Sequence, residues 1–143
     1  MKASYEEKFM KIQGELVSLC LEAMEGVEVS KIYLYEAISE HSQAFNVLCE
    51  ADGMPKWLHE IGMDSKSIDS LLRTGTIDMM DAIRDLCKEC EASRPTEIKG
   101  IYDVETGGFE MDCQYDTIDV DVSEAMKIWI DELKAAKAAG TQA

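Results

Sequence analysis

The segment from Asp103 to Glu124 concentrates chemically active side chains of one kind. It holds eight carboxylates and no lysine or arginine, while Lys99 precedes it and Lys127 follows it. The carboxylates are Asp103, Glu105, Glu110, Asp112, Asp116, Asp119, Asp121 and Glu124. Grouped carboxylates can hold a metal ion, exchange protons in catalysis, or attract a basic macromolecule.

The spacing of these acids argues against the first two uses. A calcium loop of the EF-hand type needs a glycine at its sharp turn, and residues 116–124 contain none. A glycosidase needs two carboxylates in a sugar-binding cleft, and nothing in the segment suggests such a platform. No phosphate-binding glycine loop occurs in the chain either. We therefore expect no metal and no cofactor.

The cysteines and histidines supply the other candidate chemistry. Cys87 and Cys90, in "CKEC", have the spacing of two zinc ligands, but no second pair follows. Both thiols fall on the apolar stripe of a helical pattern, which favours core packing. His41 lies in an expected turn and His59 lies beside Trp57, and neither accompanies a nucleophile motif. We therefore do not expect an enzyme.

The composition is that of an acidic globular protein. The chain has 143 residues, which favours one domain, and 14 basic residues stand against 29 acidic ones for a net charge of −15. Such a charge repels nucleic acid and anionic membranes and attracts basic proteins, although solubility alone also explains it. Five cysteines, no apolar signal segment after Met1 and no long apolar run favour the cytoplasm, with free thiols and no membrane contact.

The first half of the chain predicts a helix and a hairpin. Ser4 and Glu7 fit a capping box, and apolar residues then recur every three or four positions until Gly26. Residues 27–39 and 44–51 are rich in strand-forming side chains and are separated by the turn signal "EHSQ". The first of these strands carries apolar groups on both faces, as a central strand does.

The middle of the chain has a weaker pattern. From Pro55 to Gly75 we expect one or two helical turns at 55–62 and a short helix at 64–72 that stops near Gly75. Thr76 is the expected cap of the next helix, which runs to Cys90.

The second half predicts another hairpin and a last helix. Strand 96–103 precedes a turn at Gly107, and residues 109–116 alternate strictly between inward apolar and outward polar side chains. In this pairing Asp103 and Glu105 come close to Glu110 and Asp112, so like charges repel. Such repulsion is tolerated where the acids prevent aggregation at an exposed strand edge or where they bind a basic partner. Ser123 is the expected cap of the last helix, and residues 137–143 should fray.

These elements predict a single α+β domain over residues 1–143. About four antiparallel strands, from two hairpins, form its sheet, with the N-terminal, middle and C-terminal helices packed on one face.

Two stretches of the chain resemble the YezG-like bacterial immunity proteins. "RPTEIKGIYDVETGGFEMDCQYD", followed by acidic residues and the helix segment "MKIWIDEL" with Trp129, is similar to their C-terminal half. "KIYLYEAIS" after an N-terminal helix resembles their first half. The resemblance implies a cytoplasmic antitoxin without enzymatic activity, which binds a toxin domain, often a nuclease.

The charge and the resemblance lead to one hypothesis. The protein neutralises a basic toxin by stoichiometric electrostatic binding, without touching nucleic acid or membranes itself. The expected contacts are Asp103, Glu105, Glu110, Asp112, Asp116, Asp119 and Asp121, with Trp57 as an aromatic anchor.

Two alternatives stay open from the sequence. One is an adaptor or chaperone for a basic partner that is not a toxin. The other is a small hydrolase with a site around His41, His59 and Cys49.

Overall fold

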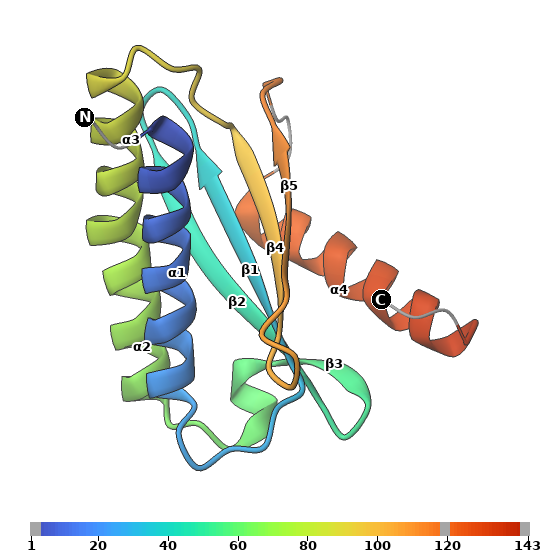
Figure 1. Ribbon diagram of the computed structural model, residues 1–143. Helices are drawn as coiled ribbons and strands as arrows, with labels where there is room; N and C mark the ends of the chain where they lie inside the picture. Colours follow the sequence, from blue (N-terminus) through green and yellow to red (C-terminus); the bar gives the residue numbers. More distant parts are fainter. Residues whose placement is uncertain (1–3, 118–120, 141–143) are drawn as a thin grey trace.

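In the described part of the chain, five strands form one antiparallel sheet in the order β3-β2-β1-β4-β5 (Figure 1). The computed structural model describes residues 4–117 and 121–140. The strands are β1 (Lys31–Ile38), β2 (Gln43–Ala51), β3 (Met54–Trp57), β4 (Glu97–Asp103) and β5 (Phe109–Gln114). Both predicted hairpins, β1–β2 and β4–β5, are present. The α+β class and the single domain are confirmed, and β3 is an additional strand.

Helices cover both faces of this sheet (Figure 1). Helices α1 (Tyr5–Ala23), α2 (Ser65–Thr74) and α3 (Met80–Glu89) lie on one face, and α4 (Val122–Ala138) lies on the other. The prediction that all helices share one face is therefore wrong. The alternation of β1 explains the arrangement, since Leu34 points to the three-helix side while Tyr33 and Tyr35 pack under α4.

The N-terminal helix begins as its sequence predicts. The Ser4 hydroxyl accepts a hydrogen bond from the Glu7 backbone N–H at 3.1 Å, which caps α1. Phe9, Leu16 and Cys20 then bury one stripe of α1 against the sheet and α3.

The connection between α2 and α3 differs from the prediction. Asp64 caps α2, but Gly75 keeps right-handed helical angles, and the π-helical segment η2 (Gly75–Met79) carries the chain directly into α3. Thr76 does not cap a helix. Its hydroxyl accepts a hydrogen bond from the Phe45 backbone N–H at 3.1 Å. Gly75 is required for packing, because a Cβ there would lie 2.1 Å from the Phe45 ring.

The segment after β2 was only partly predicted. Met54–Trp57 form the edge strand β3, and the 3-10 helix η1 (Leu58–Ile61) follows it. Pro55 weakened the strand signal because proline removes a ladder donor, but an edge strand tolerates it. Among the described residues, no helix combines the length and the apolar character needed to cross a membrane.

The last helix is longer than predicted. Helix α4 continues to Ala138, and the Lys137 ammonium lies 3.0 Å from a carboxylate oxygen of Glu50 on β2. The expectation that the chain frays from residue 137 is therefore wrong for Lys137 and Ala138. Residues 141–143 lie outside the described part of the chain.

The cysteines are all free thiols. Cys87 is buried in α3, where its sulfur lies 3.5 Å from the Tyr5 hydroxyl, and Cys90 is half-buried at the end of the same helix. Within residues 4–117 and 121–140, no group of three or more histidine, cysteine or acidic side chains is placed to hold a metal ion.

Candidate interaction surface

The β4–β5 turn uses one of its acids to build its own backbone. The Asp103 carboxylate accepts hydrogen bonds from the backbone N–H groups of Glu105 at 3.0 Å and Thr106 at 3.1 Å. Gly107 takes a positive φ of 78°, which closes the turn. Asp103 is therefore a structural residue first, whereas the Glu105 side chain is exposed.

The register of β4 and β5 separates the acids that were expected to repel. Glu110 lies opposite Ile101, and Asp112 lies opposite Lys99. Asp103 faces Gly108, to which it donates its backbone N–H at 2.8 Å. Asp103 and Glu105 therefore do not lie directly opposite Glu110 or Asp112, where like charges would repel most strongly. Glu105 lies in the turn between β4 and β5 and is paired with no residue of β5.

The outer row of β5 opens into a cavity beside α4. Glu110 and Asp112 are exposed and lie on the α4 side of the sheet, yet α4 does not cover them. They line a cavity of about 280 Å³ together with Lys99, Ile101, Met111 and Trp129. The Lys99 ammonium lies 5.7 Å from the centre of the Trp129 ring, so it is held by a cation–π contact. Asp112 therefore has a cation nearby, whereas Glu110 faces an apolar neighbour.

A second cavity, on the other side of α4, brings Trp57 and Asp121 together. Asp121 caps α4 by accepting a hydrogen bond from the Glu124 backbone N–H at 2.8 Å. The cavity measures about 650 Å³. Its lining consists of Asn46, Trp57, Asp121, Ser123, Glu124, Met126 and Lys127. Trp57 is half-buried and stacks on His59, with ring centres 6.5 Å apart. This pair of predicted contacts thus lies away from the β4–β5 hairpin.

The remaining predicted acids lie near the end of β5. Asp116 is exposed, and its backbone carbonyl accepts a hydrogen bond from the Thr96 hydroxyl at 2.5 Å. Asp119 lies outside the described residues.

Two acids that sequence reasoning missed extend the surface at the turn. Glu28 and Asp52 line a cavity of about 380 Å³ together with Glu105. Asp52 also forms an exposed ion pair with Lys56 at 3.4 Å. Glu28 and Asp52 come from different loops, so only the strand pairing brings them to Glu105. Only a prediction of the complete strand pairing could have placed Glu28 and Asp52 beside Glu105.

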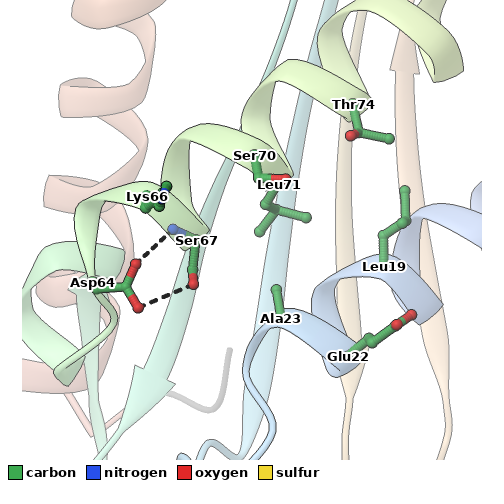
Figure 2. A pocket seen from close by; sticks show the side chains of 9 residues that line it. All are labelled: Leu19, Glu22, Ala23, Asp64, Lys66, Ser67, Ser70, Leu71 and Thr74. Atoms are coloured by element: carbon green, nitrogen blue, oxygen red, sulfur yellow. Dashed lines mark hydrogen bonds between the residues drawn. The ribbon is translucent and has the colours of Figure 1, made fainter.

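A groove between α1 and α2 carries none of the predicted residues. Figure 2 shows Leu71 of α2 directed toward Ala23 and Leu19 of α1, with the hydroxyls of Ser67, Ser70 and Thr74 along the rim. Its volume is about 460 Å³. Ser67 is engaged in capping, since its backbone N–H and hydroxyl both donate to Asp64. These bonds lower the pKa of Asp64. The lining includes no histidine or cysteine to activate a hydroxyl.

The structure does not bring the histidines and Cys49 together. His41 lies in the β1–β2 turn, and Cys49 lies six positions after the first residue of β2, on the order of 20 Å along the strand. Cys49 is buried and its thiol donates to the Lys56 backbone carbonyl at 3.8 Å, while the exposed His59 stacks on Trp57. The hydrolase hypothesis therefore has no assembled site among these three residues.

Two buried carboxylates have strongly altered environments. Glu36 is fully buried, and burial raises its pKa to about 8 even though Gln13 donates a hydrogen bond to it at 2.9 Å. Burial acts on Glu50 in the same direction, but hydrogen bonds from Ser30 and Lys137 outweigh it and hold the pKa of Glu50 below its usual value. Both groups serve the fold, since Glu36 is enclosed by the core and Glu50 is fully bonded.

No protein-family model matches the sequence, and no curated protein matches it.

Proposed function

We propose that this protein is an immunity protein that binds and neutralises a basic toxin domain, most simply a nuclease, in a stoichiometric complex. The observation that carries the proposal is the exposed acidic surface of the β4–β5 hairpin. We name this surface the acidic face and define it as Glu105, Glu110 and Asp112, together with Glu28 and Asp52 at the turn.

The acidic face suits a cationic protein for physical reasons. Three of its carboxylates, Glu105, Glu110 and Asp112, form no ion pair within 4.0 Å among the described residues. The net charge of −15 adds a long-range attraction that speeds the encounter with a basic partner. A nuclease that binds nucleic-acid phosphates through basic residues would present the complementary surface. The YezG-like sequence features support the same assignment.

The test is capture of the partner from extracts of the native cells, followed by its identification and titration. The immobilised chain should retain a basic toxin domain at a one-to-one ratio, and the purified complex should lack the toxin's activity. Binding measured at about 0.05 M and about 0.5 M salt should weaken strongly at the higher concentration, where the Debye length is short.

A charge-reversal pair localises the contact. Glu110→Lys with Asp112→Lys should slow association with the captured toxin by about tenfold or more at low salt, because charged residues of an interface mainly set the association rate. Glu15→Lys with Asp69→Lys changes the net charge equally on exposed positions of α1 and α2, and it should slow association much less.

The outcomes separate the candidates. An unchanged association rate in the β5 variant would remove β5 from the interface. Recovery of a basic partner that has no toxic activity would instead assign the alternative role, an acidic adaptor or chaperone. Failure to recover any salt-sensitive partner would leave the charge as a solubility feature and overturn the proposal.

A further inference from the structure

The two edges of the sheet are protected very differently. β3 forms one edge, spans four residues and contains Pro55, which has no N–H to offer a further strand. β5 forms the other edge, spans six residues and contains no proline. Among the described residues, no strand pairs with the outer side of β5. Only β5 therefore presents a long, open edge.

The register fixes which backbone groups of β5 face outward. Asp103 donates its backbone N–H to the Gly108 carbonyl at 2.8 Å, which sets the phase of the β4–β5 ladder. Donors alternate along an antiparallel strand, so the N–H groups of Glu110 and Asp112 point to β4. The N–H groups of Phe109, Met111 and Cys113 consequently point to the open edge.

The two rows of side chains on β5 determine which residue types would suit a strand paired with it. Phe109, Met111 and Cys113 are half-buried and pack against the core on the three-helix side. Glu110 and Asp112 are exposed on the opposite side, beside the cavity formed with Ile101 and Trp129. A strand laid along β5 would continue both rows. Its apolar side chains would extend the first row, and its basic side chains would meet the carboxylates of the second.

We propose that β5 is a strand-docking edge, which a basic partner occupies with an extended segment of alternating apolar and basic residues. The inference rests on the proposed function, because it gives the geometry by which the acidic face holds its partner. Backbone hydrogen bonds to the outward groups of β5 bind the segment. The charged end of a lysine or arginine lies beside Glu110 and Asp112, which border the cavity with Ile101 and Trp129.

A second copy of this chain fits the edge poorly. If two β5 strands paired antiparallel about Met111, Glu110 of each copy would lie beside Asp112 of the other. Carboxylates directly opposite one another on paired strands destabilise the pairing, and the net charge of −15 on each chain adds to the repulsion. The same acids that block self-association therefore favour a cationic strand.

The test uses a synthetic peptide, so it does not depend on finding a toxin. The probe is a capped peptide of about eight residues with alternating lysine and valine, long enough to span β5. Amide NMR signals and hydrogen exchange of the labelled protein are followed during titration. Exchange at Phe109, Met111 and Cys113 should slow by about tenfold or more at saturation, while amides of β3 stay unchanged.

Three controls define the result that would overturn the proposal. The same peptide with N-methylated valines keeps its charge but loses backbone donors, and a glutamate–valine peptide reverses the charge. Both should leave the three amides unprotected. Glu110→Gln with Asp112→Asn should weaken binding of the lysine–valine peptide about tenfold or more, whereas Glu15→Gln with Asp69→Asn, on exposed positions of α1 and α2, should not. Equal binding of the N-methylated peptide, or no protection of the three amides, overturns strand docking.

The peptide result is independent of the capture experiment. If the peptide does not protect β5 but a toxin with salt-sensitive binding is captured, only the proposal of strand docking is overturned. If the peptide protects β5 but no toxin is captured, strand docking stands and the proposal of toxin binding is overturned.

Discussion

At the scale of single residues, the buried pair of Glu36 and Gln13 makes the core sensitive to pH. Gln13 donates to one Glu36 oxygen, while Glu36 Oε2 and Gln13 Oε1 are buried without a hydrogen-bond partner. A proton on Glu36 turns its unpaired acceptor oxygen into a potential donor, and Gln13 Oε1 of the same pair is an unsatisfied acceptor. Burial raises the pKa of Glu36 to about 8, so the neutral acid is the form that suits this site.

This pair makes stability depend on pH. The folded-state pKa of about 8 lies above the ordinary value of 4.5, so the proton's stabilisation is complete below about pH 4.5 and is lost as pH rises through 8. Between these values the free energy of unfolding should fall by up to about 1.4 kcal/mol per pH unit from this group. Glu36→Gln mimics the neutral acid and should remove this slope in urea denaturation. Glu110→Gln, at an exposed site, should keep it; parallel profiles for wild type and Glu36→Gln would contradict the assignment.

Gly75 is a second residue with a specific role, because close packing against Phe45 leaves no room for a side chain there. A methyl group there would lie 2.1 Å from the Phe45 ring, so helix or strand must shift. Gly75→Ala should lower the free energy of unfolding by about 1–3 kcal/mol or more, the usual cost of overpacking. Gly14 is the matched control, because it lies in α1 with nothing within 4 Å of a new Cβ. Gly14→Ala should raise stability by about 0.5–1 kcal/mol. Equal effects of the two changes, measured by urea denaturation, would remove the packing role.

At the scale of elements, the sequence predicts periodic segments well and their spatial placement poorly. The alternation from Phe109 to Gln114 gives the correct inner and outer rows of β5, because one face of that strand is buried. A glycine in the sequence can indicate either the end of a helix or a site of close packing. Gly75 was predicted to end a helix, but it lies inside a continuous helical segment and allows close packing against Phe45. An amphipathic pattern shows that Trp129 faces the sheet, but it does not show which face. The apolar groups on both faces of β1 carry that information, which the prediction of helices on one face did not use.

The candidate surface shows the same limit. The hairpin acids are adjacent in sequence, so their grouping was visible without a structure. Glu28 and Asp52 join Glu105 only through the strand order, and Trp57 joins Asp121 only because α4 begins beside β3. These contacts depend on long-range pairing, which local patterns do not contain.

Helix α4 is fastened to the sheet by an ion pair near its C-terminal end. Glu50 is buried and bonds to Lys137 at 3.0 Å, with Ser30 at 2.8 Å and Tyr33 at 3.3 Å completing its shell. Lys137→Ala leaves this carboxylate short of a donor and should cost about 1–3 kcal/mol of unfolding free energy at pH 7. Lys127→Ala, at an exposed position of α4, should cost much less. Loss of equal stability in both variants would show that the ion pair contributes nothing specific.

The pKa of Glu50 gives this prediction a second readout. Because the pKa is lowered in the folded state, its stabilisation is present above the ordinary value of 4.5 and is lost as pH falls below it. The deficit of Lys137→Ala should therefore shrink in acid. A deficit that is constant from neutral to acidic pH would point to lost packing of the lysine stem instead.

At the scale of the whole molecule, the charge of −15 acts on the fold as well as on partners. Like charges repel within the folded chain, and added salt screens this repulsion as the Debye length falls from about 10 Å at 0.1 M to about 3 Å at 1 M. The melting temperature should therefore rise by several degrees, or about 1 kcal/mol of stability, between low and high sodium chloride. Glu110→Lys with Asp112→Lys changes the net charge by +2 at each site, from −15 to −11, and should show a smaller rise. An equal rise in both proteins would assign the salt effect to hydrophobic burial. A smaller rise in the variant would show that Glu110 and Asp112, which we propose bind a basic partner, lower the stability of the free protein.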